Sequence, residues 1–148
     1  MNNLFHISLP CTDINKTTYF YKNIIGLEIG RNTANWADIN LFGNQVTFIA
    51  VEKFNLNSPN YVFERKILPS FHFGVIVEMN KWTKLYNKLS QLDLEVVNQS
   101  VFLSNQKGEH LSFFIKDPND YMLEFKSFKN NNDIFTIHQE TSRNLHKD

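Results

Sequence analysis

The chain has 148 residues, which suits one domain or two half-domains that share a core. Its fifteen basic and fifteen acidic residues cancel, and no basic stripe runs along it, so nucleic acid and anionic membranes are not expected partners. The single cysteine excludes an internal disulfide, and no apolar run approaches the length of a membrane span. We therefore expect a cytoplasmic protein.

The first half of the chain predicts the order strand, helix, strand, strand, strand. His6 and Ser8 share one face of the first strand, because side chains alternate along a strand. Thr12 or Asp13 can cap the helix, and Gly26 is a natural stop after it. The predicted elements are a strand over 3–9, a helix to about 25, and strands over 27–32, 36–42 and 45–53.

The second half predicts the same order after a joint over residues 55–69. The joint shows no clear periodicity and reads as a linker or a lid. From 129 the chain turns polar, which predicts a loose tail in which His138 and His146 are solvated. The predicted elements of this half are a strand over 70–78, a helix over 80–92, and strands over 94–102, 109–115 and 121–128.

The two halves are near copies of each other. His6 in Phe-His-Ile and His72 in Phe-His-Phe are 66 residues apart, and the later Leu-Glu-Ile and Leu-Glu-Val runs recur at almost the same spacing. Two copies at such a long period indicate fused half-domains rather than a solenoid. The sequence thus predicts an α+β fold of two βαβββ modules, over 1–54 and 70–128, followed by a tail over 129–148.

Three polar residues lie inside strands that are otherwise apolar: His6, His72 and Glu124. A carboxylate in such a strand is costly to bury unless it is paired or bound to a cation. Two imidazoles and one carboxylate are a recognised ligand set for a divalent metal. The alternative is that each histidine is a hydrogen-bonded core residue and that the glutamate faces solvent, and spacing alone leaves both interpretations open.

Several short motifs, in this order, resemble the vicinal oxygen chelate superfamily, which includes glyoxalase I, extradiol dioxygenases, and bleomycin- and fosfomycin-resistance proteins. The resemblance covers roughly residues 3–128 and is closest to small bacterial proteins described as predicted extradiol-type dioxygenases. The motifs that carry it are Phe5-His6-Ile7, Asp13, Phe20-Tyr21, Ile25-Gly26-Leu27, Trp36-Ala37-Asp38, Phe42-Gly43-Asn44-Gln45, Phe71-His72-Phe73-Gly74-Val75, Asp117-Pro118-Asn119 and Leu123-Glu124-Phe125-Lys126-Ser127-Phe128.

The resemblance implies that the two modules form a curved mixed-sheet cleft around a metal held by His6, His72 and Glu124. Glyoxalase I places a further carboxylate on the fourth strand, but residues 46–50 carry none, so a three-ligand site with Fe(II) first and Mn(II) second is expected. The implied function is a dioxygenase-like enzyme whose small substrate, with aromatic compounds among the candidates, chelates the metal through two adjacent oxygens.

Other positions depart from the ring-cleaving pattern. Phe114 stands where those enzymes carry a tyrosine, and His110 is the nearest histidine to the expected acid–base position, although it is displaced. Gln45, Ser8 and Phe114 are candidate substrate contacts, and turn stabilisation or core packing is the alternative for each. A fosfomycin-type thiol transferase and a non-catalytic protein that sequesters a drug or metabolite therefore stay open. Members of the superfamily commonly dimerise, sometimes by exchanging modules, and the sequence does not decide between a monomer and a homodimer.

Overall fold

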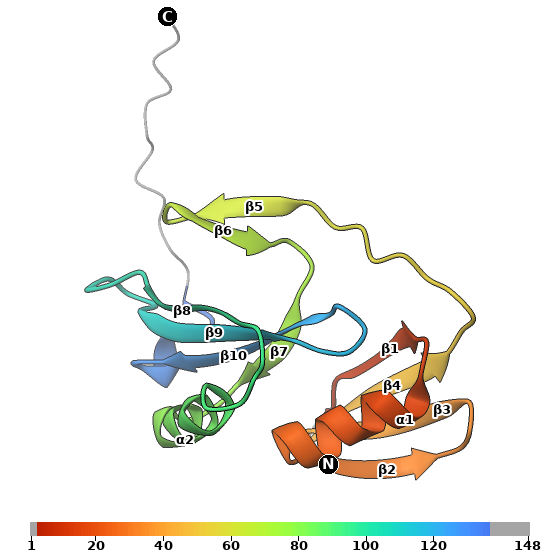
Figure 1. Ribbon diagram of the computed structural model, residues 1–148. Helices are drawn as coiled ribbons and strands as arrows, with labels where there is room; N and C mark the ends of the chain where they lie inside the picture. Colours follow the sequence, from red (N-terminus) through yellow and green to blue (C-terminus); the bar gives the residue numbers. More distant parts are fainter. Residues whose placement is uncertain (1–2, 137–148) are drawn as a thin grey trace, which may run out of the picture.

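The computed structural model describes residues 3–136, apart from the side chains of residues 97 and 98. It contains two four-stranded mixed sheets, each accompanied by a helix, and a separate two-stranded hairpin (Figure 1). The α+β class and the two βαβββ modules are therefore confirmed. The elements are β1 (His6–Cys11), α1 (Ile14–Tyr19), η1 (Phe20–Ile25), β2 (Glu28–Asn32), β3 (Trp36–Leu41), β4 (Asn44–Ala50), β5 (Asn60–Phe63), β6 (Lys66–Pro69), β7 (Phe73–Ile76), α2 (Met79–Leu89), β8 (Val96–Phe102), β9 (His110–Lys116), β10 (Met122–Phe128) and η2 (Asn131–Asp133).

In the first module the sheet order is β1-β4-β3-β2, with β1 and β4 parallel. Asp13 caps α1, since its carboxylate accepts a hydrogen bond of 2.9 Å from the backbone N–H of Lys16. The helix continues without a break into the π-helical turn η1 and ends at Gly26, whose φ of 94° is the left-handed conformation that glycine adopts easily. One long predicted helix is thus an α-helix followed by a wider turn.

The second module repeats this plan with the order β7-β10-β9-β8, and β7 pairs with β10 in parallel. The inward face of α2 buries Trp82 and Leu89, and the Trp82 indole donates to the backbone oxygen of Phe125 at 2.9 Å. The strand expected over 70–78 is shorter, because β7 begins only at Phe73. His72 therefore lies immediately before a strand and not within one.

The joint between the modules contains a hairpin formed by β5 and β6. This hairpin was not predicted, because the sequence of the joint shows no clear periodicity. Its two turn residues, Glu64 and Arg65, have φ values of 46° and 64°. These match the turns that suit the twist of a hairpin, although glycine or asparagine usually occupies such positions. Because neither Gly nor Asn stands at this turn, no residue pattern there predicts a hairpin.

The two modules share one hydrophobic core, built from the helix-bearing faces of both sheets. Hydrogen bonds join them across this core: the Tyr21 hydroxyl donates to Asp117 at 2.9 Å, and the Tyr121 hydroxyl donates to the backbone oxygen of Pro10 at 2.9 Å. The opposite face of each sheet is turned away from the shared core. Both outer faces carry the residues that the sequence singled out.

The tail predicted over 129–148 begins with the short helix η2, and His138 and His146 lie outside the described residues. Within residues 3–136, no helix is long and apolar enough to cross a membrane.

Candidate functional site

A small pocket lies between the outer face of the second sheet and the β5–β6 hairpin. Its volume is about 180 Å³. The sheet contributes the polar groups, and the hairpin contributes Tyr61, Phe63 and Leu68 as an apolar cover. The other lining residues are His72, Phe102, His110, Phe114, Glu124 and Lys126.

His72 and Glu124 meet in this pocket, with the Nε2 atom of His72 3.4 Å from a carboxylate oxygen of Glu124. The Nδ1 atom of His72 lies 2.8 Å from the backbone oxygen of Pro69. A carbonyl oxygen only accepts, so Nδ1 carries a proton, and Nε2 is the ring nitrogen that can offer a lone pair to the pocket. The pair therefore offers one nitrogen and one oxygen donor at a shared point.

Gly74 brings the two strands close enough to set Glu124 in place. It lies directly opposite Glu124 in the parallel pairing of β7 with β10. A Cβ atom at this position would lie 1.9 Å from the Glu124 backbone oxygen, which no side chain tolerates. Glycine leaves the carboxylate uncovered on its β7 side, while Phe114 is its partner on β9.

His110 and Phe114 form the far wall of the pocket. The His110 ring stacks between Phe102 and Phe128, at centroid distances of 5.3 and 5.1 Å. Its Nδ1 atom lies 2.8 Å from the backbone oxygen of Gly108, so this ring also presents Nε2 as an acceptor. Burial lowers the pKa of His110, which favours a neutral ring at pH 7.

Lys126 is a member of the pocket that the sequence reasoning missed. Its ammonium lies 3.4 Å from the same Glu124 oxygen that faces His72. Lys126 follows Glu124 by two residues on β10, so strand alternation puts both on one face. That spacing was visible in the sequence and would have predicted a cation beside the carboxylate.

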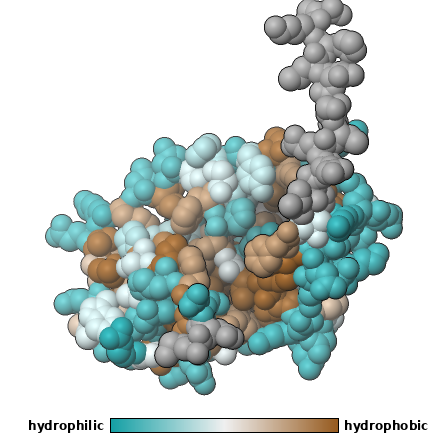
Figure 2. All heavy atoms as spheres, turned by 180° about the vertical axis from the view of Figure 1, so that it is seen from behind, coloured by the Kyte–Doolittle hydropathy of each residue, from teal (hydrophilic) through white to brown (hydrophobic). Residues whose placement is uncertain are grey.

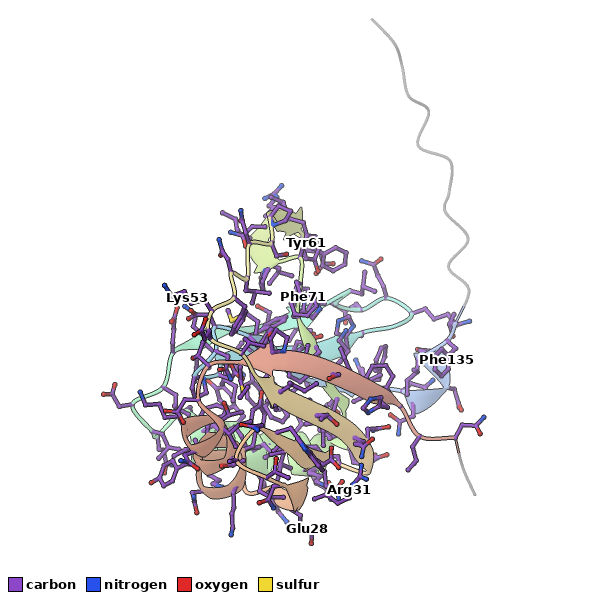
Figure 3. All side chains as sticks on the ribbon, turned by 90° about the vertical axis from the view of Figure 1, so that its right-hand side faces the viewer. Glu28, Arg31, Lys53, Tyr61, Phe71 and Phe135 are labelled. Carbon is purple, nitrogen blue, oxygen red and sulfur yellow. The ribbon has the colours of Figure 1, made fainter. Side chains whose placement is uncertain are left out.

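The remaining predicted residues lie on the outer face of the first sheet. His6 and Gln45 are directly opposite each other in the pairing of β1 with β4, and Ser8 is opposite Thr47 in the next row. His6 and Ser8 are exposed, and Gln45 is half-buried. In Figure 3 the hairpin residue Tyr61 lies at the top of the molecule and Arg31, on the first sheet, lies near the bottom. The predicted residues thus fall into two groups on different sheets, His72 with Glu124 and His6 with Gln45, and we call each group a half-site.

The strand registers show how the two half-sites correspond. Two residues after His72, Gly74 is opposite Glu124; two residues after His6, Ser8 is opposite Thr47. Thr47 thus holds in the first module the position that Glu124 holds in the second. No carboxylate occupies it, as expected, but the Thr47 hydroxyl donates to the Asp38 carboxylate at 2.6 Å from the neighbouring strand β3.

The structure brings His72, Glu124, His110 and Phe114 together and leaves His6, Ser8 and Gln45 on the other sheet. Among residues 3–136, no group of three or more His, Cys, Asp or Glu side chains is close enough to hold a metal ion within one chain. The expected three-residue ligand set is accordingly divided into a pair, His72 with Glu124, and the separate His6.

Several solved structures share this fold. A glyoxalase/bleomycin resistance protein/dioxygenase from Alicyclobacillus acidocaldarius superposes with a TM-score of 0.75 at 23% identity, over 90% of this chain and 97% of that one. The fosfomycin resistance protein FosX from Listeria monocytogenes gives 0.65 at 15% identity, over 90% and 98%. Lactoylglutathione lyase from Agrobacterium tumefaciens gives 0.63 at 14% identity, over 86% and 94%. At these identities the likeness is one of fold, and the different names show that one fold serves different chemistry.

The sequence itself matches a protein family over residues 3–125, which include nearly all of both modules and every site residue that the sequence predicted. That family is described as the glyoxalase/bleomycin resistance protein/dioxygenase superfamily. The match, the duplicated βαβββ architecture and the solved structures agree. The chain belongs to the glyoxalase/bleomycin resistance protein/dioxygenase superfamily.

Proposed function

We propose that the protein is a metal-dependent, dioxygenase-like enzyme that acts on a small substrate with two adjacent oxygens, aromatic compounds among the candidates. The observation that carries the proposal is the pairing of His72 and Glu124 at 3.4 Å in a pocket walled by aromatic rings. Fe(II) is the leading candidate metal and Mn(II) the second, because two imidazoles and a carboxylate favour these ions where positions stay open.

The donor pair fits a divalent ion on its chemistry. Ligand atoms about 2.0–2.2 Å from one ion are compatible with a separation of 3.4 Å between the His72 nitrogen and the Glu124 oxygen. The hydrogen bond from His72 to Pro69 fixes the ring and its tautomer, as partners of metal-bound histidines commonly do. When bound, the metal would supply a Lewis-acid centre and, as Fe(II), redox capacity.

The remaining pocket residues have roles that their surroundings support. His110 is the proposed proton acceptor, since its lowered pKa and its Nε2 lone pair suit a base at neutral pH. Phe114 and Phe102 are walls for a flat substrate. On the first sheet, Gln45 and Ser8 are the proposed hydrogen-bonding contacts to substrate.

We further propose that a second copy of the chain completes the site by placing His6 beside the partner's metal pair. Outside the area that the hairpin covers, the outer faces of both sheets carry exposed apolar side chains such as Ile49 on β4 and Ile76 on β7, each 45% exposed. Figure 2 shows hydrophobic side chains gathered near the middle of the face seen from behind, with polar ones around them. A homodimer would cover such surface and unite the two half-sites.

Elemental analysis tests the metal site. After anaerobic loading with Fe(II) or Mn(II), the wild type is expected to retain stoichiometric metal, and His72→Ala and Glu124→Gln are expected to lose it. His110→Gln is the matched control, because it alters an imidazole of the same pocket that is not a proposed ligand. A wild type that stays metal-free, or equal retention in all variants, would reject the site.

Mixing two inactive variants tests the shared site. His6→Ala and His72→Ala are each expected to be metal-free as homodimers. If His6 acts in trans, refolding them together restores about one quarter of the sites, because each mixed dimer holds one intact site. No recovery, with mixed dimers demonstrated by mass spectrometry, would place all three ligands in one chain or none.

The second candidate is sequestration of a ligand without turnover. The observation that favours it is Lys126, which neutralises Glu124 without any metal and leaves an aromatic pocket ready for a neutral or anionic ring. Ligand-dependent O₂ uptake by the metal-loaded protein would favour the enzyme. Unchanged ligand binding after treatment with a chelator, with no uptake, would favour sequestration.

A further inference from the structure

The second strand of the first module contains a β-bulge at Gly30–Arg31. Ile29 is paired with Ile39 and Asn32 with Ala37, so three steps along β2 match two along β3. Strict alternation would put Arg31 on the same face as Ile29, which packs against the core. Instead the Arg31 side chain reaches Asp38 on the outer face, which is the kind of re-aiming that bulges produce beside functional sites.

A buried carboxylate holds Arg31 by one edge. The Arg31 Nε atom donates to one oxygen of Asp38 at 3.0 Å, and the Thr47 hydroxyl donates to the other at 2.6 Å. Burial alone would raise the pKa of Asp38, which is 5% exposed, but the hydrogen bonds from Thr47 and Arg31 and the Arg31 charge outweigh it and lower that pKa. The Trp36 ring supports the guanidinium at 5.5 Å.

The other edge of the guanidinium is free to bind a ligand. Among the described residues, neither terminal amino group of Arg31 has a hydrogen-bond acceptor, and the side chain is 76% exposed. It opens on a hollow of about 360 Å³ that is also lined by Asn40 and Gln45. Figure 3 shows Arg31 on the outside of the first sheet, near its lower edge.

We propose that Arg31 recognises an anionic group, a carboxylate or a phosphoryl group, on the substrate. A planar guanidinium with both terminal amino groups free matches two oxygens of such a group in a bidentate contact. An ordinary surface ion pair would explain the Arg31–Asp38 contact less well, since here the acid is buried and the bulge and Trp36 fix the base. The anion site stands on these residues alone; its role as a substrate contact rests on the function proposed above.

Nuclear magnetic resonance of ¹⁵N-labelled protein tests the inference, with inorganic phosphate and acetate as probes and sodium chloride at equal ionic strength as the reference. We expect saturable shifts of the Arg31 Nε–H and Trp36 Nε1–H signals, with a Kd of about 1–10 mM for so small a ligand. A stronger response to phosphate identifies a phosphoryl group, and a stronger response to acetate identifies a carboxylate.

Three variants complete the test. Arg31→Gln is expected to abolish the Trp36 shift. Arg31→Lys, which keeps a cation beside Asp38 and guards against loss of folding, is expected to weaken binding about tenfold, because the ammonium lacks the planar fork. Arg65→Gln removes an equal charge from the exposed hairpin tip and is expected to bind like the wild type. The same shifts in Arg31→Gln and the wild type, or no saturable shift in the wild type, overturn the inference.

Metal retention separates this inference from the proposed function. Arg31→Gln is expected to retain Fe(II) or Mn(II) like the wild type, because Arg31 is not a proposed ligand. A wild type that binds phosphate at Arg31 but no metal would reject the enzyme and leave the anion site standing. A wild type that binds metal but no anion would reject the anion site and leave the proposed metal site standing.

Discussion

Single residues set the geometry of the half-site on the second sheet. Hydrogen bonds to Pro69 and Gly108 orient the two imidazoles, and Gly74 lets Glu124 lie against β7 without a covering side chain. The sequence identified His72 and Glu124 because each interrupts an apolar run. It did not reveal the hydrogen bonds that fix the rings, because backbone carbonyl partners leave no signal in residue types.

Gly74→Ala is expected to destabilise the protein by about 3 kcal/mol or more, since the added methyl group meets strand backbone that has no room to yield. Gly30→Ala is the matched control, because there an added Cβ would have its nearest neighbour at 3.5 Å, an ordinary contact. Urea denaturation of both variants measures the difference. Similar free energies of unfolding for the two would show that β7 lies further from β10 than described.

At the scale of elements, the hairpin decides access to the pocket. The pocket of about 180 Å³ is smaller than the roughly 300–1,000 Å³ of typical ligand sites, so most ligands would need the hairpin to lift. Lys66 binds the Ser100 hydroxyl and lies 5.2 Å from the Phe102 ring, Glu64 accepts from the Leu103 N–H at 3.1 Å, and Leu68 is buried against Phe102 and Phe114. The residues of β5 are exposed, and such an exposed strand opens more readily than a core strand.

Lys66→Met is expected to speed amide hydrogen exchange within the hairpin about fivefold, which corresponds to the loss of roughly 1 kcal/mol of polar contact. Exchange in β9 and β10 should stay as slow as in the wild type. Lys53→Met, at an exposed position of the joint, is the control with the same change of charge and shape. Exchange that rises equally in the hairpin and in β10 would indicate global unfolding and not a local opening.

The elements predicted from the sequence and those it missed differ in how local their causes are. Alternation and capping residues predicted most strands and both helices, because these signals act over a few neighbouring residues. The hairpin turn at Glu64–Arg65 and the bulge at Arg31 depend on pairing with another strand. These constraints come from residues that are distant in the chain, so a local sequence pattern does not predict them.

At the scale of the whole molecule, the duplication was predictable but the way the halves meet was not. The apolar face of each sheet is buried in the same way whether the outer faces meet within one chain or across two chains. The sequence alone therefore permits a cleft within one chain or between two. Contacts between residues far apart decide it, and the hydrogen bond from Tyr21 to Asp117 spans 96 positions. The core-side packing leaves His6 and His72 on different sheets, which is why we propose that a second copy unites them.

The bond from Tyr21 to Asp117 gives the packing of the modules a measurable dependence on pH. Burial raises the pKa of Asp117 above its ordinary value, and hydrogen bonds from Asn119, Tyr21 and Tyr121 offset part of that rise. Because the pKa of Asp117 is higher in the folded state, this carboxyl favours folding at pH values below its pKa in the unfolded chain, which is about 3.9. That contribution is lost as the pH rises through the pKa in the folded state. The Tyr21 bond supports the charged form, so its stabilising effect is largest at neutral pH.

Tyr21→Phe is therefore expected to lower the free energy of unfolding by about 1.5–3 kcal/mol at pH 7.5, the range for a hydrogen bond to a charged group. The loss should shrink as the pH is lowered from 7.5 and Asp117 gains its proton at its raised pKa. Urea denaturation across this range measures it, and Tyr19→Phe, at a position 62% exposed, is expected to change stability by less than about 0.5 kcal/mol. A loss that is equal at both ends of the range would mean that Asp117 keeps one charge state throughout.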